Sequence, residues 1–178
     1  MKFKKSCTLI LAGVAALSCS IISFAQTPDA KTSTVAEKSA KSQQEVIDEI
    51  YERTGVHVTP APGSTIYVNP EKISGATTRA TSAPTKEAPS YPATGNWSNT
   101  KNYTYTKYYF RAGTFSAEAS ARFDTEYYKK DGTYIMSSSS SSFQQPAHRD
   151  GATLSSYYYV KIINGSSSAS TNASWTAN

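Results

Sequence analysis

Few residues in this chain could carry out acid–base or nucleophilic chemistry. Asp124 and Glu126 stand two apart in the stretch 114–128, where a strand would place them on one face with Glu118. Two nearby carboxylates can act as the acid and base of a glycoside hydrolase. Acidic residues with Arg122 between them are, however, typical of a solvated strand face. We therefore expect no catalytic residue here and interpret the protein as non-enzymatic.

The other candidates for catalysis or metal binding are isolated. His148-Arg149-Asp150 matches the start of a kinase catalytic loop, but 178 residues are too few for that fold, and the sequence has no glycine-rich phosphate loop. We interpret Asp150-Gly151 as a turn. His57 and His148 are far apart, and neither zinc nor calcium ligand spacing occurs. The sequence predicts no cofactor and no metal site.

Tyrosine is the residue type in clear excess, with 13 copies. In "YYF" and "YYY" consecutive residues are aromatic, and consecutive side chains of a strand point to opposite faces. Each strand would therefore carry aromatic residues on both faces, with tyrosine on the outward one. A flat ring with a hydroxyl suits protein interfaces and sugar faces at little entropic cost. The alternative is that tyrosine simply favours strands and packs on cross-strand partners. The candidates for a binding surface are Tyr105, Tyr109, Tyr128, Tyr134, Tyr157 and Tyr159.

The N-terminus predicts export. Three lysines precede an apolar run over residues 8–22, and Ser23-Phe24-Ala25 offers small residues for signal peptidase, with cleavage after Ala25. The alternatives are a membrane anchor or a buried helix, and a lipoprotein processed at Cys19. Both cysteines lie within the signal, and a secreted chain free of disulfides is typical of bacteria.

Charge argues against a nucleic-acid partner. The formal net charge is +5, but the signal holds three of the lysines, so +2 remains after cleavage. The remaining basic residues are scattered among acids, whereas nucleic-acid binding needs a basic patch.

Composition divides the chain into four parts. A signal peptide (1–25) precedes a small N-terminal element (26–69), a Pro/Thr/Ala-rich linker (70–95) and a Tyr/Ser-rich β domain (96–178). The N-terminal element begins with a flexible lead-in. Apolar spacing and a capping box then predict a helix over 43–54, and two short strands follow.

The fold class expected for the C-terminal domain is mainly β, as an antiparallel β-sandwich or open barrel. One predicted hairpin joins 114–128 to 134–143 through Lys130-Asp131-Gly132, with Tyr128 facing Tyr134, Tyr127 facing Ile135, and Phe123 facing Ser139. A second joins 154–163 to 166–175 through Asn164-Gly165, with Leu154 facing Trp175.

The first hairpin also permits a membrane hypothesis, because its alternating strands are long enough to cross a bilayer. Over 115–143 it resembles the insertion hairpins of aerolysin-like pore-forming toxins. Export, low cysteine content, β-rich sequence and tryptophan at both ends (Trp97 and Trp175) resemble lactococcin 972-type bacteriocins. The membrane-facing candidates are Phe115, Phe123, Tyr127, Ile135 and Phe143.

Three functions remain open from the sequence. The first is a secreted protein that binds a cell-envelope glycan or a partner protein through outward tyrosines. The second is a bacteriocin or pore-forming toxin acting on a target-cell membrane, with a leader removed at a linker site such as Arg79. The third is a matrix protein that self-associates through exposed strand edges.

Overall fold

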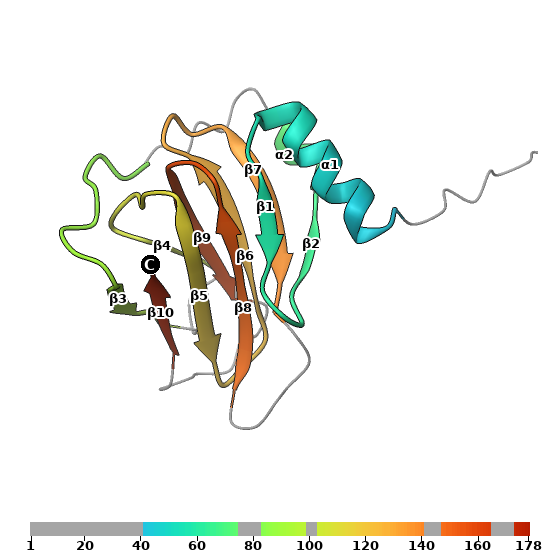
Figure 1. Cartoon of the computed structure of the whole chain (residues 1–178). Helices are drawn as coiled ribbons and strands as arrows, with labels where there is room; N and C mark the ends of the chain where they lie inside the picture. The colour runs from blue at the N-terminus through green and yellow to red at the C-terminus, as the bar shows by residue number, and fades with distance from the viewer. Residues whose placement is uncertain (1–40, 75–82, 99–102, 141–146, 165–172) are drawn as a thin grey trace, which may run out of the picture. The chain divides into compact units, whose positions relative to one another are not determined.

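The computed structural model describes residues 41–74, 83–98, 103–140, 147–164 and 173–178. Two five-stranded antiparallel sheets make up most of this part of the chain (Figure 1). Sheet A has the order β1-β8-β5-β10-β3, and sheet B has the order β2-β7-β6-β9-β4. The arrangement is that of a β-sandwich, as the sequence predicts.

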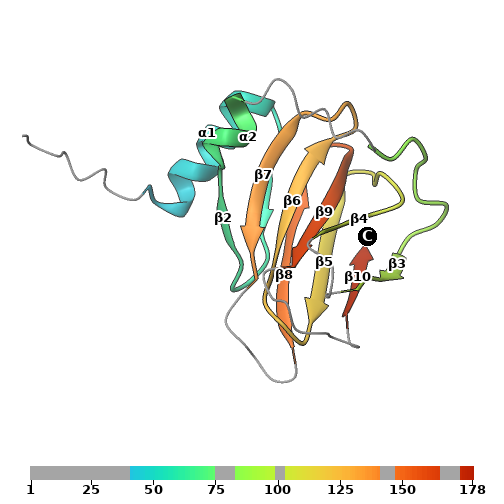
Figure 2. The same ribbon diagram turned by 180° about the vertical axis from the view of Figure 1, so that it is seen from behind.

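Sheet A draws its strands from almost the whole described chain. They are β1 (Val58–Pro60), β8 (His148–Leu154), β5 (Gly113–Ala119), β10 (Ala173–Ala177) and β3 (Ala93–Asn96). Sheet B, which faces the viewer in Figure 2, consists of β2 (Thr65–Tyr67), β7 (Tyr134–Ser139), β6 (Phe123–Lys129), β9 (Tyr158–Asn164) and β4 (Tyr103–Tyr105).

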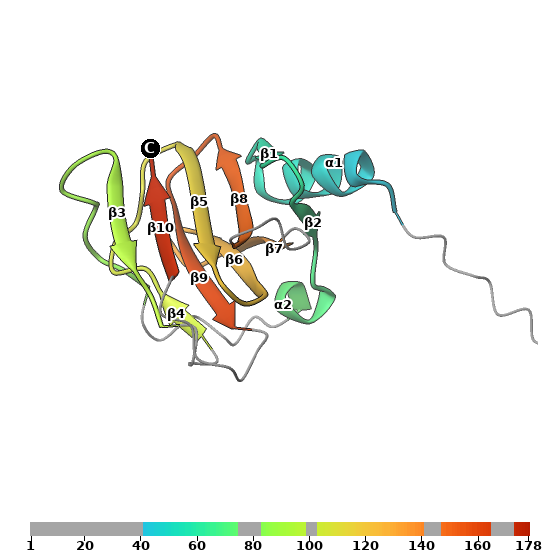
Figure 3. The same cartoon turned by 90° about the horizontal axis from the view of Figure 1, so that it is seen from below.

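Helix α1 (Gln43–Thr54) lies beside the edge strands β1 and β2 (Figure 3). The predicted capping box is present: Ser42 caps the first turn together with Glu45. Val46 and Ile50 are buried, and Gln43 bonds both the backbone N–H and the C=O of Ile66, each at 2.9 Å. Gln43 therefore pairs backbone groups that an edge strand would otherwise leave open.

Aromatic rings from both sheets meet between them. Phe110 lies 5.9 Å from Phe115 and 5.4 Å from Trp175, measured between ring centroids. Trp175 pairs in register with Ala117 on one side and Gly95 on the other, and a Cβ on Gly95 would stand 2.5 Å from the indole. The small residues of β5 thus belong to an ordinary core layer covered by rings.

A buried carboxylate connects the two sheets at their centre. Asp150 on β8 is 2% exposed and accepts hydrogen bonds from Thr125 on β6 (2.6 Å) and Ser138 on β7 (2.5 Å). The N–H of Gly151 also donates to it at 2.8 Å. Burial raises the pKa of Asp150, although these donors act in the opposite direction.

The prediction that Asp150-Gly151 forms a turn is wrong, because both residues lie within β8. Glycine is needed there for close approach: a Cβ on Gly151 would stand 2.4 Å from the carbonyl oxygen of Phe115.

The first predicted hairpin is wrong in its first strand. The stretch 114–128 is two strands: β5 in sheet A and β6 in sheet B, with the chain crossing at 120–122. The crossing keeps the parity, so Phe115 and Phe123 both point into the shared core. The β6–β7 pairing does exist. Tyr128 faces Tyr134 as predicted, but a register shift places Tyr127 opposite Met136.

The second predicted hairpin is also wrong. Strand β9 pairs with β6 and β4 in sheet B, whereas β10 pairs with β5 and β3 in sheet A. Leu154 faces Val58 and Gly113 instead of Trp175. Residues 165–172, which include the predicted turn glycine, lie outside the described residues.

The segments expected before the β domain join the same two sheets. Strand β1 pairs with β8, β2 pairs with β7, and residues 39–178 cluster as one compact unit. Within the predicted linker the structure shows α2 (Pro70–Ser74) and β3. Strands β1, β2 and β3 are short, and each of them pairs with a strand from the C-terminal part of the chain.

We predict that Asp150→Asn changes how stability depends on pH. The pKa of Asp150 is raised in the folded protein above its ordinary value of 3.8. The folded protein therefore holds this proton more tightly than the unfolded chain does. The wild type therefore loses stability relative to Asp150→Asn as pH rises from 3.8 through the raised pKa. Urea unfolding of both proteins between pH 3 and 8 measures the difference, and a constant difference across that range would refute it.

Candidate functional site

The structure brings the six candidate tyrosines together. Tyr128, Tyr134 and Tyr159 form a buried cluster, with Tyr105 and Tyr109 packed against it. Tyr157 joins through Tyr109, at 5.9 Å between ring centroids. Register places Tyr128 beside both Tyr134 and Tyr159, on the side of sheet B that faces away from sheet A.

Half of these rings are buried, which corrects the expectation that all six form an open tyrosine surface. Tyr159 is fully buried, Tyr128 and Tyr134 are 6% exposed, and only Tyr157 of the six is as much as 50% exposed. Tyr128 stacks on Tyr159 at 5.1 Å with 10° between the ring planes. Tyr128, Tyr134 and Tyr159 therefore serve mainly as packing for one another, and Tyr105 and Tyr109 lie partly buried against them.

Residues on both sides of the boundary between the predicted N-terminal element and the predicted linker contact the residues around this tyrosine cluster. The N–H of Asn69 donates to the Tyr134 hydroxyl at 3.1 Å. Lys72 on α2 reaches the buried Glu126 at 3.4 Å, and Glu126 also accepts a hydrogen bond from Tyr128 at 2.6 Å. Lys161 lies 3.7 Å from the same carboxylate. The ion pair between Lys72 and Glu126 thus connects α2 to β6, and Lys161 on β9 adds a second cation to the same carboxylate.

Burial also sets the ionisation of the cluster. It raises the pKa of Tyr159 to about 12, and it raises the pKa of Tyr128 further with help from the Glu126 carboxylate. Both hydroxyls therefore stay protonated at neutral pH, and the Tyr128 hydroxyl donates its proton to the Glu126 carboxylate.

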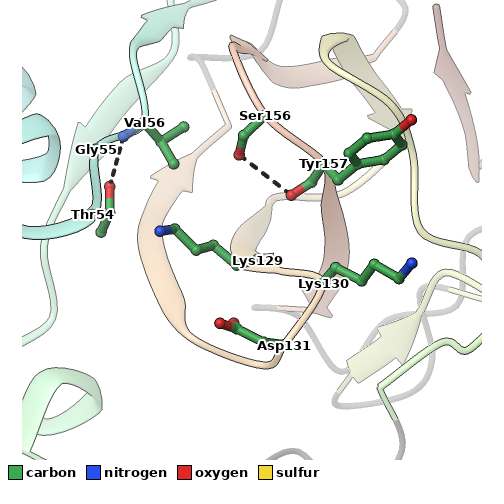
Figure 4. Close-up of a pocket in the computed structure, with 8 residues that line it drawn as sticks. All are labelled: Thr54, Gly55, Val56, Lys129, Lys130, Asp131, Ser156 and Tyr157. Carbon is green, nitrogen blue, oxygen red and sulfur yellow. Dashed lines mark hydrogen bonds between the residues drawn. The ribbon is translucent and has the colours of Figure 1, made fainter.

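Tyr157 stands beside a pocket of about 610 Å³ at one end of the sandwich (Figure 4). Three connections meet there: the α1–β1 connection, the β6–β7 turn and the β8–β9 loop. The lining residues are Thr54, Gly55, Val56, Lys129, Lys130, Asp131, Ser156 and Tyr157.

Local structure fixes each wall of this end pocket. Gly55 ends α1 in the left-handed conformation (φ 69°), and its N–H donates to the carbonyl of Tyr51. In the β6–β7 turn, the N–H of Lys129 bonds the carbonyl of Thr133 at 2.8 Å. The N–H of Thr133 bonds the Asp131 carboxylate at 2.9 Å and lowers its pKa. Both the helix end and the turn agree with the sequence prediction.

The rim of the end pocket combines rings with charges. Lys130 Nζ lies 4.3 Å from the centre of the Tyr109 ring, which itself meets Tyr157 edge to face. Tyr51 on α1, which is 46% exposed, stacks on His57 at 4.1 Å between ring centroids, but neither residue lines the pocket. Exposed rings beside amine and carboxylate groups can hold a ligand by stacking and hydrogen bonds.

The residues that a membrane-inserting hairpin would need lie in the core. Phe115, Phe123, Tyr127 and Ile135 have no exposed surface, and they belong to both sheets. Phe143 and the predicted processing positions Ala25 and Arg79, like Cys19, lie outside the described residues.

The acidic candidates are dispersed. Glu118 is on β5 in sheet A, half-exposed and 3.4 Å from Arg149, whereas Asp124 and Glu126 are on β6 in sheet B. Among the described residues, no three His, Cys, Asp or Glu side chains are placed to share a metal ion.

Sequence reasoning named Tyr157 but missed Thr54, Val56 and Lys129 as pocket residues. A helix end and a hairpin turn were each predicted locally. Their meeting depends on the long-range pairing of β1 with β8, for which the sequence carries no local signal.

No model of a known protein family matches the chain, and searches of curated proteins and of solved structures found no significant match. In the part of the chain that the structure describes, no helix is long and apolar enough to span a bilayer.

We predict that the tyrosines differ sharply in their contribution to stability. Tyr159→Ala empties a fully buried site and lowers the free energy of unfolding by about 3–5 kcal/mol. Tyr157→Ala changes it by less than about 1 kcal/mol, because half of its ring is already solvated. Urea unfolding of both variants measures this, and equal losses would contradict the assignment of Tyr157 to the surface.

Proposed function

We propose that this chain is an exported, non-catalytic binding protein that holds a cell-envelope glycan or a partner surface at the end pocket, with Tyr157 as the anchor. The observation that carries the proposal is the position of Tyr157: a half-exposed ring at the rim of the pocket, backed by the Tyr109 ring.

The chemistry of the end pocket suits recognition. Tyrosine offers a large contact area while fixing only two torsions, so a ligand that stacks on Tyr157 orders little side-chain freedom. Lys130 and Asp131 are exposed beside it and supply a donor and an acceptor for ligand hydroxyl or amide groups.

The site is also preorganised. The β6–β7 turn is closed by backbone hydrogen bonds, and the neighbouring loops are tied by two bonds between His57 and Ser155, at 2.9 and 3.1 Å. A rigid site loses little entropy when it binds a ligand.

We predict that Tyr157→Ala weakens binding to isolated bacterial cell envelopes by at least about tenfold, as is typical of an aromatic anchor. Tyr67→Ala is the matched control, since Tyr67 is 36% exposed on β2, away from the pocket. Co-sedimentation with purified envelopes and with peptidoglycan sacculi measures the affinity. Equal losses in the two variants, or none in Tyr157→Ala, would overturn the proposal.

A second variant blocks the end pocket without removing a ring. Asparagine tolerates the left-handed conformation of Gly55, and no atom lies within 4 Å of a Cβ at that position. Gly55→Asn should therefore fold, project into the pocket and weaken binding in the same assay. Retained affinity would show that the ligand does not enter the pocket.

A further inference from the structure

The outward side of sheet A carries a second depression, of about 560 Å³, that the proposed function does not use. It crosses β8, β5 and β10, which lie side by side in Figure 1, and the β1–β2 loop at Pro62 borders it. Short side chains make the depression: Ser116, Ser174 and Thr176 line it, and Gly151 pairs with Ser116 without a side chain of its own.

Two rows of polar groups run across the strands in this sheet A groove. Register aligns Arg149, Glu118 and Ser174 in one row, and it aligns Ser116 with Thr176 in the next. With strands about 4.8 Å apart, a row over three strands is about 10 Å long. A chain of more than one small unit could therefore lie across the strands.

The charges of the groove balance. Arg149 Nε and Glu118 Oε2 are 3.4 Å apart, and both side chains are about half-exposed or more. One cation paired with one anion gives no field that favours a polyanion such as nucleic acid.

The groove also lacks the features of a protein interface. Such interfaces are anchored by protruding aromatic, Met or Arg side chains and are depleted in serine. Trp175 borders the groove but is only 8% exposed, and the remaining neutral side chains of the two rows are serine and threonine. The two rows present three hydroxyl groups, from Ser116, Ser174 and Thr176, beside one carboxylate and one guanidinium.

We propose that the sheet A groove binds a neutral glycan chain. The Glu118 carboxylate accepts hydrogen bonds from sugar hydroxyls, Arg149 donates to ring and hydroxyl oxygens, and Ser116 and Thr176 do both. The site is independent of Tyr157, so a protein with both sites could hold a glycan on one surface while its end pocket holds a second ligand.

The test is an amide chemical-shift titration of the full mature chain with hexasaccharides of glucose, xylose and N-acetylglucosamine. The proposal expects at least one of them to shift residues 116–118, 149 and 174–176 saturably, and to bind at least about tenfold more tightly than its monosaccharide. No shift with any hexasaccharide up to 10 mM, taken as roughly the weakest affinity that counts as binding, would overturn it. Saturable binding of a neutral Gly/Ser peptide to the groove, without binding of the hexasaccharides, would also overturn the proposal.

Three variants show which site produces the chemical-shift changes. Ser116→Arg fills the middle of the groove and should abolish the shifts, whereas Thr59→Arg, exposed on β1 of the same sheet, should not. Tyr157→Ala should leave the titration unchanged. If Tyr157→Ala removes these shifts, the glycan site is the end pocket, and the sheet A groove is refuted while the proposed function stands.

Discussion

The hydrogen bonds of Asp150 are the constraint on which the rest of the structure depends. Most of the core between the sheets is apolar and does not by itself specify how one sheet lies on the other. Asp150 does, because a buried carboxylate is costly unless its oxygens are satisfied, and the hydroxyls of Thr125 and Ser138 satisfy them from the opposite sheet. Burial and these directed bonds together select one alignment of sheet A on sheet B.

Both proposed binding surfaces follow from that alignment. The end pocket needs the α1–β1 connection, the β6–β7 turn and the β8–β9 loop at the same end of the sandwich, and these come from both sheets. The sheet A groove needs β8, β5 and β10 side by side, and Asp150 is on the first of these strands. The tyrosine cluster has a different role: it gives sheet B a second buried layer and leaves Tyr157 as the most exposed of the six candidate tyrosines.

Local features were predictable from the sequence, and long-range ones were not. Helix 43–54, its capping box and the Lys130-Asp131-Gly132 turn depend on neighbouring residues, and the structure confirms them. The division of 114–128 between two sheets could not be seen in the sequence. The inward residues have odd numbers in both β5 and β6, so the alternation of apolar and polar residues continues unbroken across the crossing. Asp150 was mistaken for a turn residue since Asp-Gly usually marks one. The outward tyrosines were misjudged because nothing in the sequence shows that Asn69 and Lys72 contact Tyr134 and Glu126.

The most direct test of this account is a double-mutant cycle between the sheets, with Asp150→Ala, Thr125→Val and the double variant compared by urea unfolding at pH 7. The account predicts that Asp150→Ala alone costs about 2–4 kcal/mol, and that the two changes are coupled by at least about 1 kcal/mol. Coupling is expected because each variant removes one end of the same buried hydrogen bond. Additive losses, or a loss below about 0.5 kcal/mol for Asp150→Ala, would contradict the claim that this carboxylate holds the sheets in place.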